Sequence, residues 1–215
     1  GADISGVGTS TIIINGVEEL YSVDHEIVPD RIEAGSFAIA SGMTKGNIEI
    51  THIRPKDLDF FLKVLNYTGS EIKIDTNSIN ITSSKRPEPY DIVTQTHPGF
   101  PTDLQAQYMA LMSIANGSAF IKETIFENRF MHVPELLRMG ANVSIKNQIA
   151  SIIGVKELKG SKVMASDLRA SMSLILAALA ALGTSEIDGI HHLDRGYEKI
   201  EDKLSNLGAI IRRSK

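Results

Sequence analysis

The sequence predicts an α/β fold of three repeated strand–helix–strand–helix–strand units, with buried helices at the centre and sheets around them. Three observations lead to this prediction. An aspartate, an apolar helical segment and a glycine follow one another three times along the chain. The apolar segments have no polar face, and short alternating runs of apolar and polar residues lie between them. Such helices belong in the interior and such strands at its boundary.

Each predicted unit begins at an aspartate, continues through about four helical turns of small and apolar residues, and stops at a glycine. These segments cover 30–46, 103–117 and 167–183. A second, amphipathic helix in each unit ends at another glycine, namely Gly69, Gly140 or Gly208. From the first aspartate to this glycine the separations are 39, 37 and 41 residues, so one unit is repeated with nearly constant spacing.

The residues at the helix ends suit their positions. Aspartate at a helix start accepts hydrogen bonds from the first free N–H groups and faces the positive end of the helix dipole. Glycine suits the left-handed position after the last turn. We therefore expect Asp30, Asp103 and Asp167 to cap the first helices and a left-handed glycine to end each helix.

The first helices should be buried because they lack charge. Segment 104–115 has no charged residue, and segment 168–182 has only Arg169. The second helices, such as 197–204, alternate charged and apolar residues and should lie nearer the surface. Several methionines fall among apolar residues and are expected to fill the core. They include Met109, Met112, Met131 and Met164.

Alternating runs predict the strands that follow and separate the helices. They lie at 11–14, 47–52, 71–75, 78–82, 118–123, 142–146, 149–153, 184–187 and 209–212. The clearest linker is the segment 84–90, which contains two prolines. The repeat units are accordingly expected at about 30–83, 91–153 and 155–213.

The composition excludes several functional classes. The 42% hydrophobic and 22% charged content is typical of a globular protein, and the net charge of -4 argues against a general nucleic-acid binder. The absence of cysteine excludes disulfides and thiolate chemistry in this polypeptide, and we expect neither a metal nor a cofactor. Segment 172–182 is too short to span a bilayer, and residues 1–3 do not resemble a signal segment. We therefore expect a cytoplasmic protein without membrane contact.

An anion site is one interpretation of the repeated pattern. If the units surround a three-fold axis, the N-termini of their first helices converge and attract phosphate or carboxylate. Arg31 and Arg169 lie beside these starts, and Arg129 and Arg195 lie in matching loops. Arginine binds such anions through two hydrogen bonds. The alternative is that each aspartate is only a cap and each arginine is solvated.

Four segments resemble the UDP-N-acetylglucosamine enolpyruvyl transferase (1-carboxyvinyltransferase) family. They read HPGFPTDLQAQ at 97–107, ETIFENRFMH at 123–132, ASDLRAS at 165–171 and DRGYE at 194–198. The resemblance covers nearly the whole chain but only the C-terminal half of the family enzyme. Shikimate-pathway enolpyruvyl transferases share the fold with different motifs. The resemblance implies an inside-out α/β domain of the enolpyruvyl transferase type.

The resemblance also implies a reaction. Members transfer the enolpyruvyl group of phosphoenolpyruvate to the 3′-hydroxyl of UDP-N-acetylglucosamine, the first committed step of peptidoglycan synthesis. Matched by position, Asp103 takes the proton of the sugar hydroxyl, Asp167 lies near the reacting carbon, and Arg195 binds phosphoenolpyruvate. The remaining implied binding residues are Ile125, through its backbone, with Phe126, Arg129, Arg169 and Asp30.

The resemblance leaves half of the enzyme outside this chain. Residues 1–29 are expected to help complete the sheet of the missing N-terminal half, and residues 30–215 to form the C-terminal domain. The missing half is the expected partner, because it carries the lid and the other residues that hold phosphoenolpyruvate. The chain alone is therefore expected to be inactive. The alternative is a non-catalytic nucleotide-sugar-binding or interaction module derived from this fold.

Overall fold

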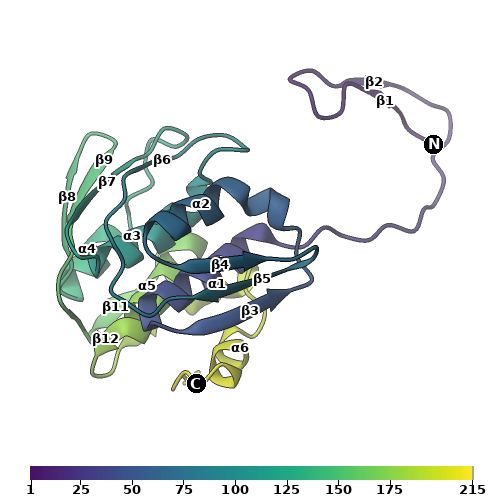
Figure 1. Ribbon diagram of the computed structural model, residues 1–215. Helices are drawn as coiled ribbons and strands as arrows, with labels where there is room; N and C mark the ends of the chain where they lie inside the picture. The colour runs from purple at the N-terminus through teal and green to yellow at the C-terminus, as the bar shows by residue number, and fades with distance from the viewer. Residues whose placement is uncertain (215) are drawn as a thin grey trace.

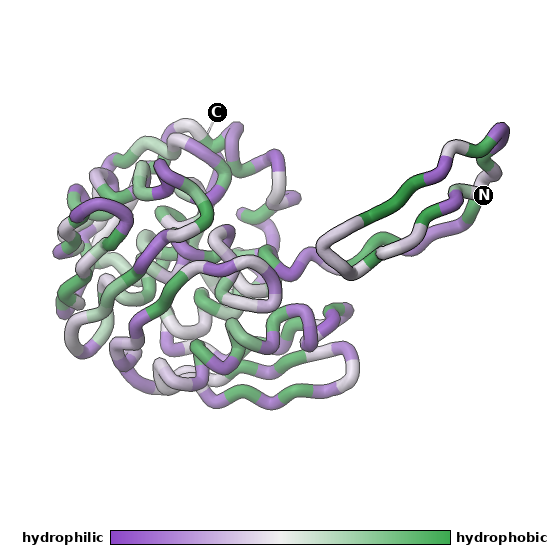
Figure 2. The backbone as a smooth tube through the Cα atoms, turned by 90° about the horizontal axis from the view of Figure 1, so that it is seen from above, coloured by the Kyte–Doolittle hydropathy of each residue, from purple (hydrophilic) through white to green (hydrophobic). Residues whose placement is uncertain are grey.

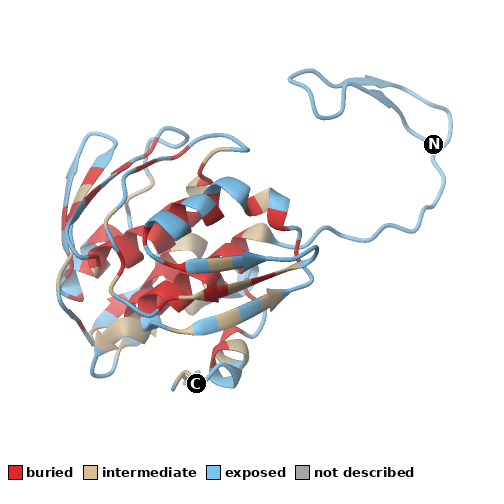
Figure 3. Cartoon of the chain, viewed as in Figure 1, coloured by how far each residue is buried: buried red, intermediate tan, exposed pale blue. Residues whose placement is uncertain are grey.

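The computed structural model describes residues 1–214. Three buried helices lie at its centre: α1 (Arg31–Thr44), α3 (Gln105–Ser113) and α5 (Leu168–Ala180). They pack against one another, and sheets and smaller helices surround them (Figure 1). Every residue of α3 is buried, and the burial colouring of Figure 3 is concentrated on these helices. The predicted arrangement of central helices and outer sheets is confirmed.

Two of the three predicted aspartate caps are confirmed. The Asp30 carboxylate accepts hydrogen bonds from the N–H groups of Ile32 and Glu33 at 2.7 and 3.3 Å. The Asp167 carboxylate does the same at the start of α5. Asp103 does not cap a helix, so this prediction is wrong. It lies inside a 3-10 turn, η2 (Thr102–Leu104), and its carboxylate is turned toward two arginines instead.

The second helices end in one repeated structure. These helices are α2 (Asp59–Tyr67), α4 (Val133–Arg138) and α6 (Ile200–Asn206). The glycines that follow them have φ of +97°, +87° and +98°, for Gly69, Gly140 and Gly208 respectively. Each glycine N–H bonds to the carbonyl three residues earlier, and the next N–H bonds to the carbonyl five residues earlier. This is the Schellman motif, and it confirms the predicted ends.

The first helices end differently from the prediction. After α1 the left-handed residue is Lys45, with φ of 55°, and not Gly46. After α5 the chain enters a short strand, β12 (Ala181–Leu182), before Gly183. Gly117 has a φ of 149°, which lies outside the helical left-handed region. These glycines therefore act in the connections that follow the helices, and not as caps.

One antiparallel sheet and one mixed sheet cover the central helices. The first has the order β3-β5-β4, from β3 (Asn47–Thr51), β4 (Glu71–Ile74) and β5 (Ser78–Thr82). The second has the order β6-β7-β9-β8, from β6 (Ile92–Val93), β7 (Ser118–Lys122), β8 (Asn142–Lys146) and β9 (Ile149–Ile153). Only β6 runs parallel to its neighbour in this sheet. Alternate residues, such as Ile79 and Ile81 or Ala150 and Ile152, are fully buried against the helices.

The third unit has only short parallel pairs. Strand β10 (Leu158–Lys159) pairs with β12, and β11 (Lys162–Met164) pairs with β13 (Glu186–Asp188). The strand predicted at 209–212 is absent from the structure, so that prediction is wrong. A strand needs a neighbour for its backbone hydrogen bonds, and within residues 1–214 no strand pairs with this segment.

The N-terminal segment lies away from the domain. Strands β1 (Asp3–Ser5) and β2 (Ile13–Asn15) form an antiparallel hairpin that extends from the body (Figure 1). All of residues 1–30 are exposed, although hydrophobic residues recur along the hairpin (Figure 2). The segment adds nothing to the core, and its expected place in another domain stays a prediction, as do the unit boundaries.

Two further observations concern apolar residues. Met109 and Met112 fill the core as predicted, but Met131 and Met164 are about half exposed, so the prediction is wrong for them. Met131 lines a pocket, and Met164 lies on the outer face of β11. Among the helices of residues 1–214, none has the length and hydropathy needed to cross a membrane.

Candidate active site

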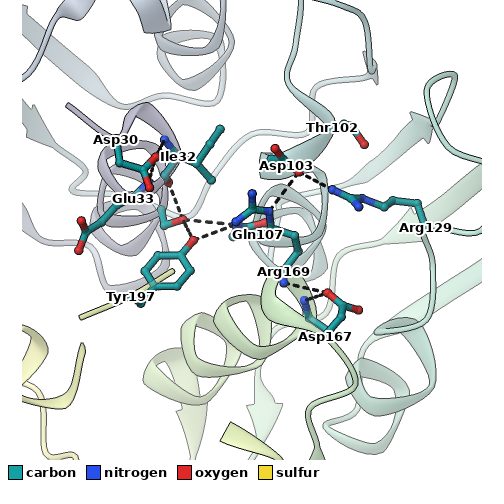
Figure 4. A network of polar contacts seen from close by, with 12 residues as sticks. Asp30, Ile32, Glu33, Thr102, Asp103, Gln107, Arg129, Asp167, Arg169 and Tyr197 are labelled. Carbon is teal, nitrogen blue, oxygen red and sulfur yellow. Dashed lines mark hydrogen bonds and ion pairs between the residues drawn. The ribbon is translucent and has the colours of Figure 1, made fainter. Parts of the chain in front are cut away.

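The site centres on Asp103, which lies between two arginines (Figure 4). Its Oδ1 accepts a hydrogen bond from Nη2 of Arg129 at 2.5 Å and from Nε of Arg169 at 3.1 Å. Arg129 follows β7, and Arg169 lies in the first turn of α5. The arginines are 26 and 66 residues from Asp103 in the sequence, so the fold of the second and third units brings the group together.

The arginines control the charge of this carboxyl group. Burial on its own would raise the pKa of Asp103, but the Arg169 and Arg129 guanidinium groups outweigh it and hold the pKa below its usual range. Asp103 is therefore an ionised hydrogen-bond acceptor at neutral pH. The two arginine side chains are three-quarters buried, whereas the Asp103 side chain is 37% exposed, so water partly screens their interaction.

A pocket of about 320 Å³ contains this group. Five of the eight predicted site residues line it, namely Asp103, Arg129, Asp167, Arg169 and Arg195. The other lining residues are Ala106, Asn128, Met131, His132, Leu168 and Ala170. Three guanidinium groups face two carboxylates, so the pocket has a positive surplus that suits an anionic ligand.

Asp167 and Arg195 differ in how many of their hydrogen-bonding atoms already have partners in the protein. Oδ1 of Asp167 is occupied by the N–H groups of Arg169 and Ala170, at 2.8 and 3.0 Å. Among the described residues, its Oδ2 accepts only a hydrogen bond of 3.3 Å from the Ser166 hydroxyl. Arg195 ends the 3-10 helix η3 (Ile190–Arg195), is exposed, and forms no ion pair within residues 1–214. Its donors are therefore available to a ligand.

The other three predicted residues lie elsewhere. Ile125 lines a second hollow of about 490 Å³, together with Phe60, Thr124 and the segment 95–99. Phe126 places its ring 4.7 Å from Cζ of Arg129, which is a cation–π contact. Asp30 caps α1 and lines neither hollow. Its role toward a ligand stays a prediction.

Sequence reasoning missed two buried polar residues near the pocket. His132 is 2% exposed, and its Nε2 has no hydrogen-bond partner in the described part of the chain. Burial lowers the pKa of His132 to about 4, so its imidazole is neutral. Glu123 is 1% exposed and forms hydrogen bonds around its whole carboxylate. The alternation of β7, in which Ala119 and Ile121 point inward, is the signal that Glu123 does too.

The site has the features of an anion site. Across residues 1–214, no group of three or more histidine, aspartate or glutamate side chains is placed to hold a metal ion. The pocket instead combines arginine donors with the Asp103 carboxylate, whose Oδ2 accepts neither arginine hydrogen bond. Such a set can hold a phosphate or carboxylate group and remove a proton from a hydroxyl nearby.

Comparisons with known proteins show the family to which the chain belongs. Residues 1–204 match the family model described as EPSP synthase (3-phosphoshikimate 1-carboxyvinyltransferase). The UDP-N-acetylglucosamine 1-carboxyvinyltransferase of Geobacter metallireducens is 53% identical over 215 residues, which are 100% of this chain and 52% of that protein. The protein of the same name from Desulfosudis oleivorans is 51% identical, over 99% of this chain and 51% of its own length. The chain thus spans about half the length of the curated relatives it matches.

Solved structures give the same result for the fold. The enolpyruvyl transferase NikO from Streptomyces tendae superposes with a TM-score of 0.87 at 30% identity. The match covers 99% of this chain and 51% of that one. An EPSP synthase from Acinetobacter baumannii superposes with a TM-score of 0.77 at 16% identity over 100% of this chain and 53% of its own, which shows the fold alone.

Proposed function

Because the chain belongs to the EPSP synthase (3-phosphoshikimate 1-carboxyvinyltransferase) family, we propose that it is the C-terminal half of a UDP-N-acetylglucosamine 1-carboxyvinyltransferase. The substrates of the whole enzyme are then phosphoenolpyruvate and UDP-N-acetylglucosamine. The observation that carries the proposal is Asp103, an ionised carboxylate held between Arg129 and Arg169 at the edge of a cationic pocket.

The geometry supports a division of roles in this reaction. The 3′-hydroxyl oxygen of the sugar forms a bond to C2 of phosphoenolpyruvate, the C2–O bond to phosphate breaks, and the hydroxyl proton leaves the sugar. Asp103 is the group that accepts this proton. Arg195, with free donors, binds the phosphate or carboxylate of phosphoenolpyruvate, and Asp167 faces the same pocket beside it.

Arg129 and Arg169 act through Asp103. Because each donates to Oδ1, the carboxylate cannot rotate freely, and Oδ2 is the oxygen left for the substrate hydroxyl. The guanidinium groups lower the basicity of Asp103 but also stabilise the negative charge that develops on the phosphate as it leaves. The backbone of Ile125 and the side chain of Phe126 are proposed to contact the sugar nucleotide, and the contact between Phe126 and Arg129 supports this role.

The remaining half of the site belongs to the missing N-terminal half of the enzyme. The chain covers 52% of the Geobacter metallireducens relative, so that half is the proposed partner. We place the whole protein in the cytoplasm, in peptidoglycan synthesis and thereby in cell division and the maintenance of cell shape. Alone, the chain binds UDP-N-acetylglucosamine weakly and does not turn it over.

An NMR titration of the isotope-labelled chain with UDP-N-acetylglucosamine tests this proposal. We expect saturable shifts of the Ile125 and Phe126 amide signals, lost in Asp103→Ala. Asp24→Asn is the control, because it removes one carboxylate from the exposed N-terminal segment. Equal shifts in Asp103→Ala would contradict the assigned role. The missing half can also be added to a chain that binds the sugar nucleotide. If turnover still does not appear, the result would favour the non-catalytic nucleotide-sugar-binding module.

A further inference from the structure

Glu123 is a buried carboxylate at the end of β7 with four hydrogen-bond donors around it. Its Oε1 accepts from the Thr94 hydroxyl at 2.9 Å and from the N–H groups of Ile125 and Phe126 at 2.8 and 3.2 Å. Its Oε2 accepts from the Thr102 hydroxyl at 2.9 Å. The donors come from three separate stretches of the chain, so the carboxylate joins them at one point.

All four donors are uncharged. Within residues 1–214, no lysine or arginine forms an ion pair with Glu123. A buried carboxylate is expensive to desolvate, and hydrogen bonds must compensate for it. An apolar side chain would fill this position at a lower desolvation cost, but it would leave two backbone N–H groups and two hydroxyls without their acceptor. The carboxylate therefore fixes geometry here rather than filling space.

Two routes lead from Glu123 to Asp103. The first is short, because Thr102 immediately precedes Asp103 in the η2 turn. The second runs through Phe126, whose ring lies 4.7 Å from Cζ of Arg129, and Arg129 in turn binds Asp103. Glu123, Thr102, Asp103, Arg129 and Phe126 thus form a closed ring of contacts. A closed ring restricts the relative movement of its members more than a single chain of contacts does.

We propose that Glu123 is a positioning residue that fixes the Asp103 carboxylate relative to the backbone of Ile125 and Phe126. The inference rests on the proposed function, in which the backbone of Ile125 and the side chain of Phe126 contact the sugar nucleotide and Asp103 takes its proton. The distance between these two features then decides whether the hydroxyl of a bound sugar reaches the carboxylate. Glu123 touches neither substrate and acts through the residues that do.

The test compares Glu123→Gln with Glu127→Gln. Both variants lose one carboxylate in the same segment, but Glu127 is exposed. Glutamine keeps the shape of Glu123 and one acceptor oxygen, while its NH₂ group cannot accept from Thr102. Charge-assisted hydrogen bonds are about twice as strong as neutral ones. We therefore expect the Ile125 and Phe126 amides of Glu123→Gln to exchange with solvent about tenfold faster, and those of Glu127→Gln to be unchanged.

A second signal reports on Asp103 itself. The Nε–H of Arg169 donates to Asp103, so its NMR signal should shift in Glu123→Gln and stay in place in Glu127→Gln. If Glu123 acted only on stability, Glu123→Gln would lower the free energy of unfolding but would not shift the Arg169 signal of the folded protein. The affinity for UDP-N-acetylglucosamine should fall about tenfold in Glu123→Gln only.

A third variant covers the case in which Glu123→Gln does not fold. Thr102→Val removes one donor and leaves the other three in place. It should shift the Arg169 signal while leaving the Ile125 and Phe126 exchange rates unchanged, and Thr102→Ser should restore the signal. Unchanged exchange and an unchanged Arg169 signal in a folded Glu123→Gln would overturn the proposal. If the unsubstituted chain does not bind the sugar nucleotide, the binding role proposed for the isolated chain fails. The amide exchange rates and the Arg169 signal are measured without ligand, so they still decide the role of Glu123.

Discussion

Replacing Asp103 with asparagine removes the charge at the centre of the site and keeps its shape. The asparagine oxygen can still accept hydrogen bonds from Arg129 and Arg169, so the change isolates the electrostatic contribution. Two guanidinium groups, 24% and 22% exposed, would then face each other without a carboxylate between them. We expect Asp103→Asn to lower the free energy of unfolding at pH 7.

The magnitude lies between two limits. A hydrogen bond to a charged group contributes about 1.5–3 kcal/mol, whereas an exposed ion pair contributes about 0–1 kcal/mol. The Asp103 side chain is 37% exposed, which requires a discount for screening by water. A loss of about 1–2 kcal/mol follows for Asp103→Asn.

The pH dependence of this loss has a defined direction. The folded pKa of Asp103 lies below its usual value of 3.8, so the unfolded chain takes up this proton first as the pH falls. The contribution of the carboxylate is therefore complete above about pH 4 and disappears as the pH falls through the folded pKa. The difference between the two proteins should be full at pH 7 and smaller at pH 3.

Urea unfolding followed by circular dichroism at both pH values measures this difference. Asp24→Asn, in the exposed N-terminal segment, should change the free energy by less than about 0.5 kcal/mol. Equal stability of Asp103→Asn and the unsubstituted chain at pH 7 would refute the reasoning. So would a loss of the same size at pH 3, because the contribution of a carboxylate with a lowered folded pKa must shrink once the pH falls below the pKa of the unfolded chain.

Three other predictions concern the core and its titration, each measured by the same unfolding assay. Gly154→Ala would place the new Cβ 2.0 Å from the backbone oxygen of Ala115 and should lower the free energy of unfolding by about 3 kcal/mol. The control Gly16→Ala, in open space, should change it by less than about 0.5 kcal/mol. Similar values for the two variants would contradict the close packing of Gly154. Tyr197→Phe removes the hydroxyl that bonds to α1 at 2.7 Å and should cost about 1 kcal/mol; an unchanged stability would show that this bond contributes nothing. Because the pKa of buried His132 is about 4, the free energy of unfolding should fall as the pH drops from about 6.5 toward 4. His132→Asn should lack this fall. Identical pH profiles of the two proteins would contradict a neutral His132.

The fold was predictable from local signals wherever a signal repeated. The left-handed glycines after α2, α4 and α6 and the strands at 78–82, 142–146 and 149–153 occur where the sequence pattern places them. Strands β6 and β10 have two residues each, too few to show an alternation. The segment 209–212 shows the opposite case, because it has the pattern of a strand but no neighbour to pair with among the described residues.

The site was less predictable because its contacts span the sequence. Asp103 and Asp167 stand in nearly the same local sequence, each followed by a leucine, yet only Asp167 caps a helix. The difference lies in Arg129 and Arg169, which reach Asp103 from 26 and 66 residues away. Glu123 was missed for the same reason, since its hydroxyl donors lie 29 and 21 residues away. The inward alternation of β7 indicates only that Glu123 is buried.

The measurement that tests the central claim most directly joins this chain to the part of a relative that it does not match. A chimera would link the part of the Geobacter metallireducens relative that lies outside the matching region to this chain, and phosphate release would be followed with both substrates. We predict phosphate release from phosphoenolpyruvate that depends on UDP-N-acetylglucosamine, with at least a hundredfold loss in Asp103→Asn. A folded chimera without activity, beside an active parent enzyme, would contradict the account, and so would turnover by this chain alone.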